Sequence, residues 1–178
     1  MNAEEIRNLL KNVKNGTLEI DSAMDKLRYL PFKDIGHTMI DSHREFRSGY
    51  PEVIYCPGKT VTQVKDIIQA MLKRDCNILA TRASEEMYNE IKQIYAKAEY
   101  HSVARIISIQ RKKLTMPNTY ISIVSAGTSD IPVAEEAVVT ASKLGNRDEK
   151  IFDVGVAGIH RLMNKIDIIR NARVIIVV

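Results

Sequence analysis

Apolar side chains recur with a helical period in the first part of the chain. The spacing predicts an amphipathic helix over 3–14, which ends at the turn signal Asn15-Gly16, and a second helix over 21–30. The segment 32–50 has neither a helical nor a strand period and is crowded with polar groups. We therefore expect residues 1–50 to form a helical and irregular N-terminal segment.

Short apolar runs alternate with helical stretches between residues 51 and 116. Thr60 and Gln63 stand at the spacing of a capping box, which predicts the start of a helix. The strands expected here cover 51–55, 77–80 and 103–109, and the expected helices cover 60–72 and 84–95. This β-α-β-α-β order predicts a small domain over 51–116 with parallel strands and crossover helices.

A second β-α-β-α-β run follows the basic loop 111–117. Its expected strands cover 120–124, 151–156 and 174–178, and its expected helices cover 132–144 and 160–171. The last strand is apolar and β-branched, which is typical of a strand buried on both faces of a parallel sheet. Because a doubly wound sheet usually continues with a loop and a helix, we expect a C-terminally truncated chain.

The fold class that these patterns predict is α/β. Residues 117–178 are expected to form the first part of a parallel, three-layer α/β/α domain of the flavodoxin-like, doubly wound type. The helical segment and the β-α-β-α-β domain precede it.

Composition changes this picture little. The chain has 178 residues, 45% hydrophobic and 27% charged, which is ordinary for a soluble globular protein. No apolar run approaches the ~20 residues that span a bilayer, and the polar, acidic start does not resemble a signal peptide, so we expect a cytoplasmic protein. The net charge is +4, but basic and acidic residues are interleaved and tryptophan is absent. These features argue against a nucleic-acid or membrane partner.

Two cysteines, Cys56 and Cys76, follow or precede apolar runs and have no companion ligands at a metal-binding spacing. We expect both to be packing residues of strands, and we expect no metal site.

Two loops at predicted strand ends carry residues suited to chemistry. Ligands of parallel α/β sheets collect where loops leave the carboxyl ends of strands. In Ser125–Asp130, small residues allow close approach of a phosphate, hydroxyls can donate to it, and Asp130 can hold a ribose hydroxyl. Helix capping explains the same residues equally well.

The second loop, Gly155 to Arg161, places an imidazole beside a guanidinium at the start of a helix. His160 can exchange a proton near neutral pH, and Arg161 can bind a phosphate or carboxylate. A surface pair without a role is the alternative for either residue alone. The occurrence of the two loops one βα unit apart favours a nucleotide site.

The runs from Ser125 to Ala137 and from Asp153 to Leu162 resemble the aminoimidazole ribonucleotide carboxylase superfamily. Within it they are most similar to the synthases of pyridinium-3,5-biscarboxylic acid mononucleotide, which act in nickel-pincer cofactor biosynthesis for lactate racemase. The segment from Asp41 to Tyr55, followed by Gly58-Lys59-Thr60, resembles the N-terminal region peculiar to those synthases.

The resemblance implies carboxylation of the pyridinium ring of nicotinic acid adenine dinucleotide, with hydrolysis of its phosphoanhydride to release AMP. Carbon dioxide or bicarbonate is the implied co-substrate, no tightly bound cofactor is implied, and Mg²⁺ is compatible with the reaction. Superfamily members assemble through the α/β domain, so we expect a homo-oligomer.

The resemblance also implies roles for individual residues. Ser129 and Asp130 match a nucleotide-binding Ser-Asp pair, His160 a proton-transfer histidine, and Arg161 a phosphate-binding arginine. The remaining nucleotide-binding candidates in the same two loops are Gly127, Thr128 and Gly158. The dipeptide Gly158-Ile159 departs from the Ser-Ala of the purine enzymes.

Two alternatives stay open: an aminoimidazole ribonucleotide carboxylase or mutase of purine biosynthesis, and a non-catalytic nucleotide-binding module. The synthases carry a cysteine implied to add to the pyridinium ring, and no residue here corresponds to it. We therefore assign no nucleophile and expect the truncated chain to be inactive by itself. In segment 41–52 the basic side chains either contact phosphate, together with Lys59, or form ion pairs with Glu45 and Glu52; those basic residues are His43, Arg44 and Arg47.

Overall fold

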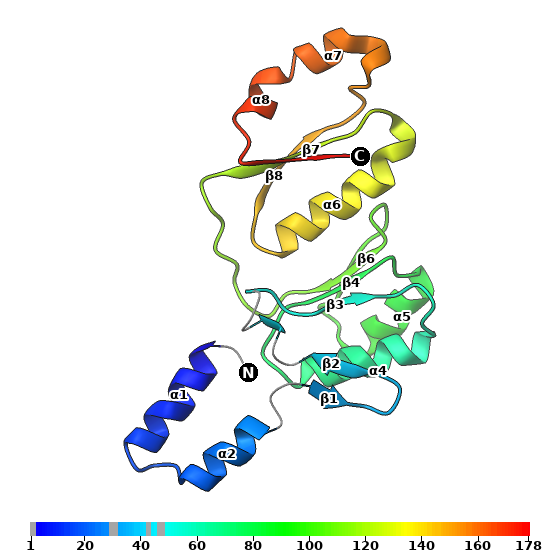
Figure 1. Cartoon of the computed structure of the whole chain (residues 1–178). Coiled ribbons are helices and arrows are strands. Elements are labelled where there is room, and N and C mark those ends of the chain that lie inside the picture. Colours follow the sequence, from blue (N-terminus) through cyan, green and yellow to red (C-terminus); the bar gives the residue numbers. More distant parts are fainter. Residues whose placement is uncertain (1–2, 29–31, 42–43, 46–48) are drawn as a thin grey trace.

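The computed structural model describes residues 3–28, 32–41, 44–45 and 49–178. Two main sheets and the helices around them lie in stacked layers, and a pair of helices extends from the N-terminal side (Figure 1). No helix within the described ranges is long and apolar enough to cross a membrane.

The N-terminal segment forms two hairpins. Helices α1 (Ala3–Lys14) and α2 (Ile20–Arg28) pack together, as the apolar periodicity predicts, although the end of the second expected helix lies outside the described residues. The prediction that irregular structure follows these helices is wrong in part, because β1 (Phe32–Asp34) and β2 (Met39–Asp41) pair antiparallel. A turn at Gly36 (φ +90°) joins them, and the Asp34 carboxylate accepts a hydrogen bond from the Gly36 N–H at 2.7 Å. Strands of three residues are too short to show an alternation of apolar and polar side chains in the sequence.

The first main sheet has the order β3-β4-β6-β5. Its strands are β3 (Val53–Tyr55), β4 (Ile78–Thr81), β5 (Glu99–His101) and β6 (Ile106–Ile109). β3 and β4 are parallel as expected, but β6 is antiparallel to β4, so the expectation of an all-parallel domain over 51–116 is wrong. The reason is the unexpected strand β5, which forms a hairpin with β6 through a turn at Arg105 (φ +54°) and reverses the chain.

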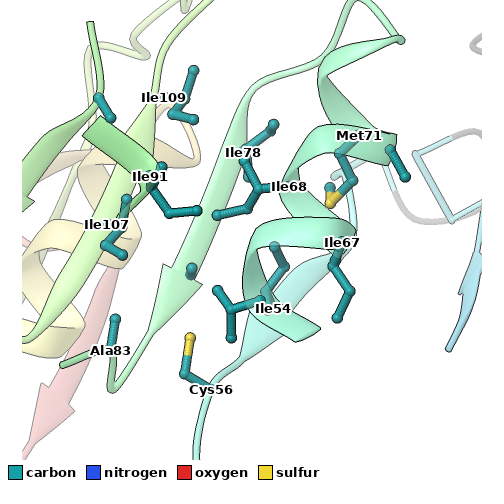
Figure 2. Packing of buried hydrophobic residues seen from close by; sticks show 14 of the residues in the cluster. Ile54, Cys56, Ile67, Ile68, Met71, Ile78, Ala83, Ile91, Ile107 and Ile109 are labelled. Atoms are coloured by element: carbon teal, nitrogen blue, oxygen red, sulfur yellow. The ribbon is translucent and has the colours of Figure 1, made fainter. Parts of the chain in front are cut away.

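Two helices cover one face of this sheet. α4 (Val61–Leu72) begins with the predicted capping box, in which Thr60 and Gln63 exchange hydrogen bonds of 3.2 and 2.9 Å. α5 (Glu85–Ile94) begins at the cap residue Ser84. Between the helices and the sheet lies the main hydrophobic core (Figure 2); among its members are Cys56, Ile68, Met71, Ile78, Ile91, Ile107 and Ile109.

The second main sheet has the order β8-β7-β9, and its strands are parallel. β7 (Tyr120–Val124) leads into α6 (Ile131–Lys143), β8 (Arg147–Ile151) leads into α7 (Ile159–Met163) and α8 (Ile166–Arg170), and β9 (Val174–Val177) follows. Parallel strands joined by crossover helices confirm the expected α/β class, and the arrangement is consistent with a flavodoxin-like fold.

Three details of this sheet differ from the expectation. The strand expected at 151–156 ends at Ile151, because the edge strand β8 is mostly polar and exposed, so apolar residues mark only its last position and the chain beyond it. The helix expected over 160–171 is two short helices, interrupted at Lys165, whose ψ of 4° departs from helical geometry. β9 is not buried on both faces: it lies at the sheet edge, and Val177 is 75% exposed.

α6 lies between the two main sheets. Val139 packs with Leu79 and Ile106 of the first sheet, whereas Ala134 and Val138 pack with Ile123 of the second. The layers therefore run in the order α4 and α5, first sheet, α6, second sheet, α7 and α8 (Figure 1).

Candidate functional site

The loops that follow β7 and β8 both lie at the carboxyl ends of the strands of the second sheet, because these two strands are parallel and adjacent. They are joined by backbone hydrogen bonds: the Val154 N–H donates to the Ser125 carbonyl oxygen at 3.1 Å, and the Gly155 N–H donates to that of Ala126 at 2.9 Å. The structure thus brings the two sequence-predicted loops together.

Close approach at this junction requires glycine. A Cβ built on Gly155 would lie 2.8 Å from the Ala126 carbonyl oxygen, which belongs to the backbone and has no freedom to move aside. Any larger residue would separate the loops.

The first loop folds back on itself before α6 begins. The Asp130 carboxylate accepts a hydrogen bond from the Gly127 N–H at 2.8 Å and one from the Ser129 hydroxyl at 3.4 Å. Asp130 is the N-cap residue of α6, but its side chain makes no capping hydrogen bond to that helix. Its carboxylate instead fixes the turn Thr128–Asp130, with Ser129 exposed at the helix N-terminus.

Ser125 carries a feature that sequence reasoning did not anticipate. It is fully buried, and its hydroxyl is the single buried side-chain N or O atom without a hydrogen-bond partner in the part of the chain that the structure describes. Alternation along β7 places it on the same face as Ile121 and Ile123, which α6 covers.

The second loop presents His160 and Arg161 on the first turns of α7, and both side chains are exposed. The Arg161 guanidinium donates a hydrogen bond to Asp153, and it lies so close to Gly158 that a Cβ there would be 2.6 Å from its Nε. Asp153 has a left-handed backbone (φ +58°), an uncommon conformation for a residue with a side chain. The spacing of residue types along the sequence did not predict the pairing of Asp153 with Arg161.

The polar segment before β3 is described only in part, since His43 and Arg47 lie outside the described residues. Glu52 accepts a hydrogen bond from the backbone N–H of Asp41 at 2.8 Å. Lys59 donates to the Tyr55 carbonyl oxygen at 2.7 Å, so its ammonium group is engaged within its own loop.

Both cysteines lie in the core of the first sheet, which confirms their packing role. The expectation that they are strand residues is wrong, because Cys56 follows the end of β3 and Cys76 precedes the start of β4. Burial raises the pKa of the Cys56 thiol to about 11, although the nearby Lys59 charge opposes the shift. Burial likewise raises the pKa of Cys76. Among the described residues, no group of three His, Cys, Asp or Glu side chains is arranged to hold a metal ion.

Comparison with known proteins gives a family match over the part of the chain that contains β1 to β6. Residues 32–112, somewhat less than half of the chain, match the family model described as LarB/PurE-like N-terminal domain. An uncharacterized protein of Methanocaldococcus jannaschii is 32% identical over 166 residues. The match covers 89% of this chain and 65% of that protein, so the chain spans somewhat less than two thirds of its relative's length.

Proposed function

We propose that this protein carboxylates the pyridinium ring of nicotinic acid adenine dinucleotide and hydrolyses its phosphoanhydride. A carbon–carbon bond forms between carbon dioxide and the ring, the displaced ring proton leaves, and water breaks the P–O–P linkage. The products are pyridinium-3,5-biscarboxylic acid mononucleotide and AMP. The observation that carries the proposal is the pair of loops joined at Gly155, which presents hydroxyls, an imidazole and a guanidinium at one sheet edge.

Each group has a proposed role in that site. Gly127, Thr128 and Gly158 belong to the loops that bind the phosphates, and Ser129 and Asp130 contact the nucleotide. Arg161 exchanges its partner Asp153 for a substrate phosphate, which it can bind with two parallel N–H donors. His160, which is exposed beside it, transfers a proton.

The other components of the reaction follow from the same proposal. Carbon dioxide or bicarbonate is the co-substrate, no tightly bound cofactor takes part, and Mg²⁺ is a candidate counter-ion for the phosphates. We assign no cysteine as nucleophile, because burial keeps Cys56 and Cys76 protonated. A homo-oligomer is the proposed assembly, and neither nucleic acid nor a membrane is a proposed partner.

Carboxylation of aminoimidazole ribonucleotide is the second candidate, because the family match is to a LarB/PurE-like domain. Calorimetric titration of the protein with each of the two nucleotides separates the candidates. The proposal expects binding of the dinucleotide, and binding of the ribonucleotide alone would overturn it.

A matched pair of variants tests the site. Arg161→Ala should weaken dinucleotide binding by roughly 10- to 100-fold, the effect of removing hydrogen bonds to a charged group. Arg170→Ala removes an exposed guanidinium from α8 and should leave binding unchanged. Equal losses in the two variants would show that general charge, and not this site, attracts the nucleotide.

Turnover is measured as AMP release in the presence of bicarbonate. AMP from the dinucleotide reports hydrolysis of the phosphoanhydride. Carboxylation is measured separately, as bicarbonate-dependent formation of the dicarboxylated mononucleotide detected by mass spectrometry. Tight binding of the dinucleotide with no AMP released is the result expected if this chain is inactive by itself, and it would favour the nucleotide-binding module for the residues described.

A further inference from the structure

We propose that the first main sheet positions α6, and with it the loop Ser125–Asp130, and that Arg82 is the positioning residue through which it acts. The inference rests on the proposed function for the identity of the nucleotide, but its central test needs no nucleotide. The inferred role of residues 32–112, which match the N-terminal domain model, is therefore to hold the candidate loop in position.

α6 has two buried sides. Glu136, Val139 and Lys143 follow the three- and four-residue spacing of one helix face, and each contacts a residue of the first sheet or its strand-end loop. The opposite face packs on the second sheet. Since α6 carries the candidate loop at its N-terminus, any shift of the helix against the first sheet moves that loop.

Of these three contacts, that of Arg82 with Glu136 lies nearest to the loop along α6. Arg82 follows β4 directly, and its Nε donates to both carboxylate oxygens of Glu136, at 3.2 and 3.3 Å. Its guanidinium carbon lies 5.7 Å from the centre of the Tyr55 ring, and Nη1 lies 3.5 Å from the Tyr55 hydroxyl oxygen. Two neighbours therefore restrain the guanidinium, although the side chain is half exposed.

The backbone of Arg82 supports the same conclusion. Its φ is +53°, a left-handed conformation that is destabilising by about 1–2 kcal/mol for a residue with a side chain. Such residues persist where surrounding contacts determine them, and they gather at functional positions. From this left-handed position the Arg82 side chain contacts both Tyr55 of its own sheet and Glu136 of α6.

The other end of α6 carries an ion pair of opposite polarity. The Lys143 ammonium group donates to the Glu99 carboxylate of β5 at 2.7 Å. Glu136 and Lys143 are separated by seven positions, or about 10 Å along a helix. Sliding the helix so that either charge met the wrong partner would bring like charges together, so the two pairs define both the direction and the register of α6 on the first sheet.

Hydrogen–deuterium exchange of the protein without nucleotide is the central test. Arg82→Ala and the milder Glu136→Gln should each raise the exchange rate of the amides in Gly127–Asp130 relative to those of β7. Arg105→Ala is the matched control, because Arg105 is also an exposed arginine with a left-handed backbone (φ +54°) and lies on the β5–β6 turn. It should leave the loop unchanged. Unchanged loop exchange in both Arg82→Ala and Glu136→Gln would overturn the proposal.

A charge exchange separates positioning from general loss of stability. Arg82→Glu combined with Glu136→Arg should restore slow exchange of the loop, while either change alone should not. Dinucleotide affinity, measured by titration, should fall by about two- to fivefold in Arg82→Ala, the range of an exposed ion pair. It should recover in the double variant. If wild-type protein binds no dinucleotide yet the loop exchanges as expected, the positioning role stands and the proposed function fails.

Discussion

Cys56 illustrates how burial decides the chemistry of a single residue. It is 1% exposed, and burial raises its pKa to about 11, against 9.0 for an exposed thiol. At pH 8 the thiolate fraction is then about a hundredfold smaller than for an exposed cysteine. We expect iodoacetamide to alkylate Cys56 at least that much more slowly in the folded protein than in guanidinium, measured by peptide mass spectrometry. Similar alkylation rates in the folded and the unfolded protein would show that the core opens readily. Cys56 would then be a candidate nucleophile.

The glycines of the second loop make a matched pair of substitutions. Gly155→Ala should lower the free energy of unfolding by about 1–3 kcal/mol, because its Cβ meets the fixed Ala126 carbonyl oxygen at 2.8 Å. Gly158→Ala should change it by less than about 0.5 kcal/mol, because the new Cβ meets only the movable end of Arg161. Urea denaturation measures both. Comparable destabilisation in the two variants would contradict the close approach of the loops.

At the scale of elements, the contact between β5 and α6 should weaken in acid. The His101 imidazole bonds to Ser108 at 3.0 Å, and its pKa is lowered by burial and then by the Lys143 charge, while Glu99 and Glu135 oppose the shift. As the pH falls below about 6.5, the unfolded chain takes up this proton before the folded one, so stability decreases. The Glu99 pKa is lowered by its hydrogen bond from Lys143, so a second loss follows as the pH falls through 4.5 and below.

Urea midpoints measured at pH 7.5, 5.5 and 4 test this prediction. His101→Gln should lessen the decrease between pH 7.5 and 5.5, and Glu99→Gln should lessen the decrease between 5.5 and 4. A wild-type midpoint that stayed constant or rose on acidification, or variants that followed the wild-type curve, would show that these groups do not set the acid response.

The elements also show what a sequence can predict. α4 and α6 were predicted to within one or two residues, because a capping box and an N-terminal Pro132 mark their starts. The antiparallel direction of β6 was missed, since the three-residue strand β5 is too short to show a period. The sequence did not predict the position of β8, because this edge strand exposes most of its side chains and they are mostly polar.

The candidate site divides in the same way. Residue types and their resemblance to a family made His160 and Arg161 candidates, which stay a prediction, and the order of the strands places their loop beside Ser125. Neither the unpartnered Ser125 hydroxyl nor the contact of Arg82 with Glu136 was predictable. Both depend on which surfaces meet in three dimensions, and the partners of the second contact are 54 positions apart.

At the scale of the whole molecule, the shared helix α6 predicts how the layers unfold. Because α6 completes the hydrophobic packing of both main sheets, neither sheet can lose it without exposing apolar surface. We expect the amides of β6 and β7, measured by hydrogen exchange, to open with the same free energy, as members of one cooperative unit. Different opening energies in the wild-type protein would show that the two sheets unfold independently.

Substitution on the two sides of α6 tests the cause of this coupling. Val139→Asp places an unpaired charge against Leu79 and Ile106, so it should release the first sheet from α6 and separate the two opening energies. Val133→Asp places the same charge on the same helix at a position that is 51% exposed, and it should leave the coupling intact. If both variants kept equal opening energies, the layers would be held together by contacts other than α6. Since the candidate loop begins this helix, separation of the layers should also accelerate exchange at Gly127–Asp130, so that loop order and cooperative unfolding change together.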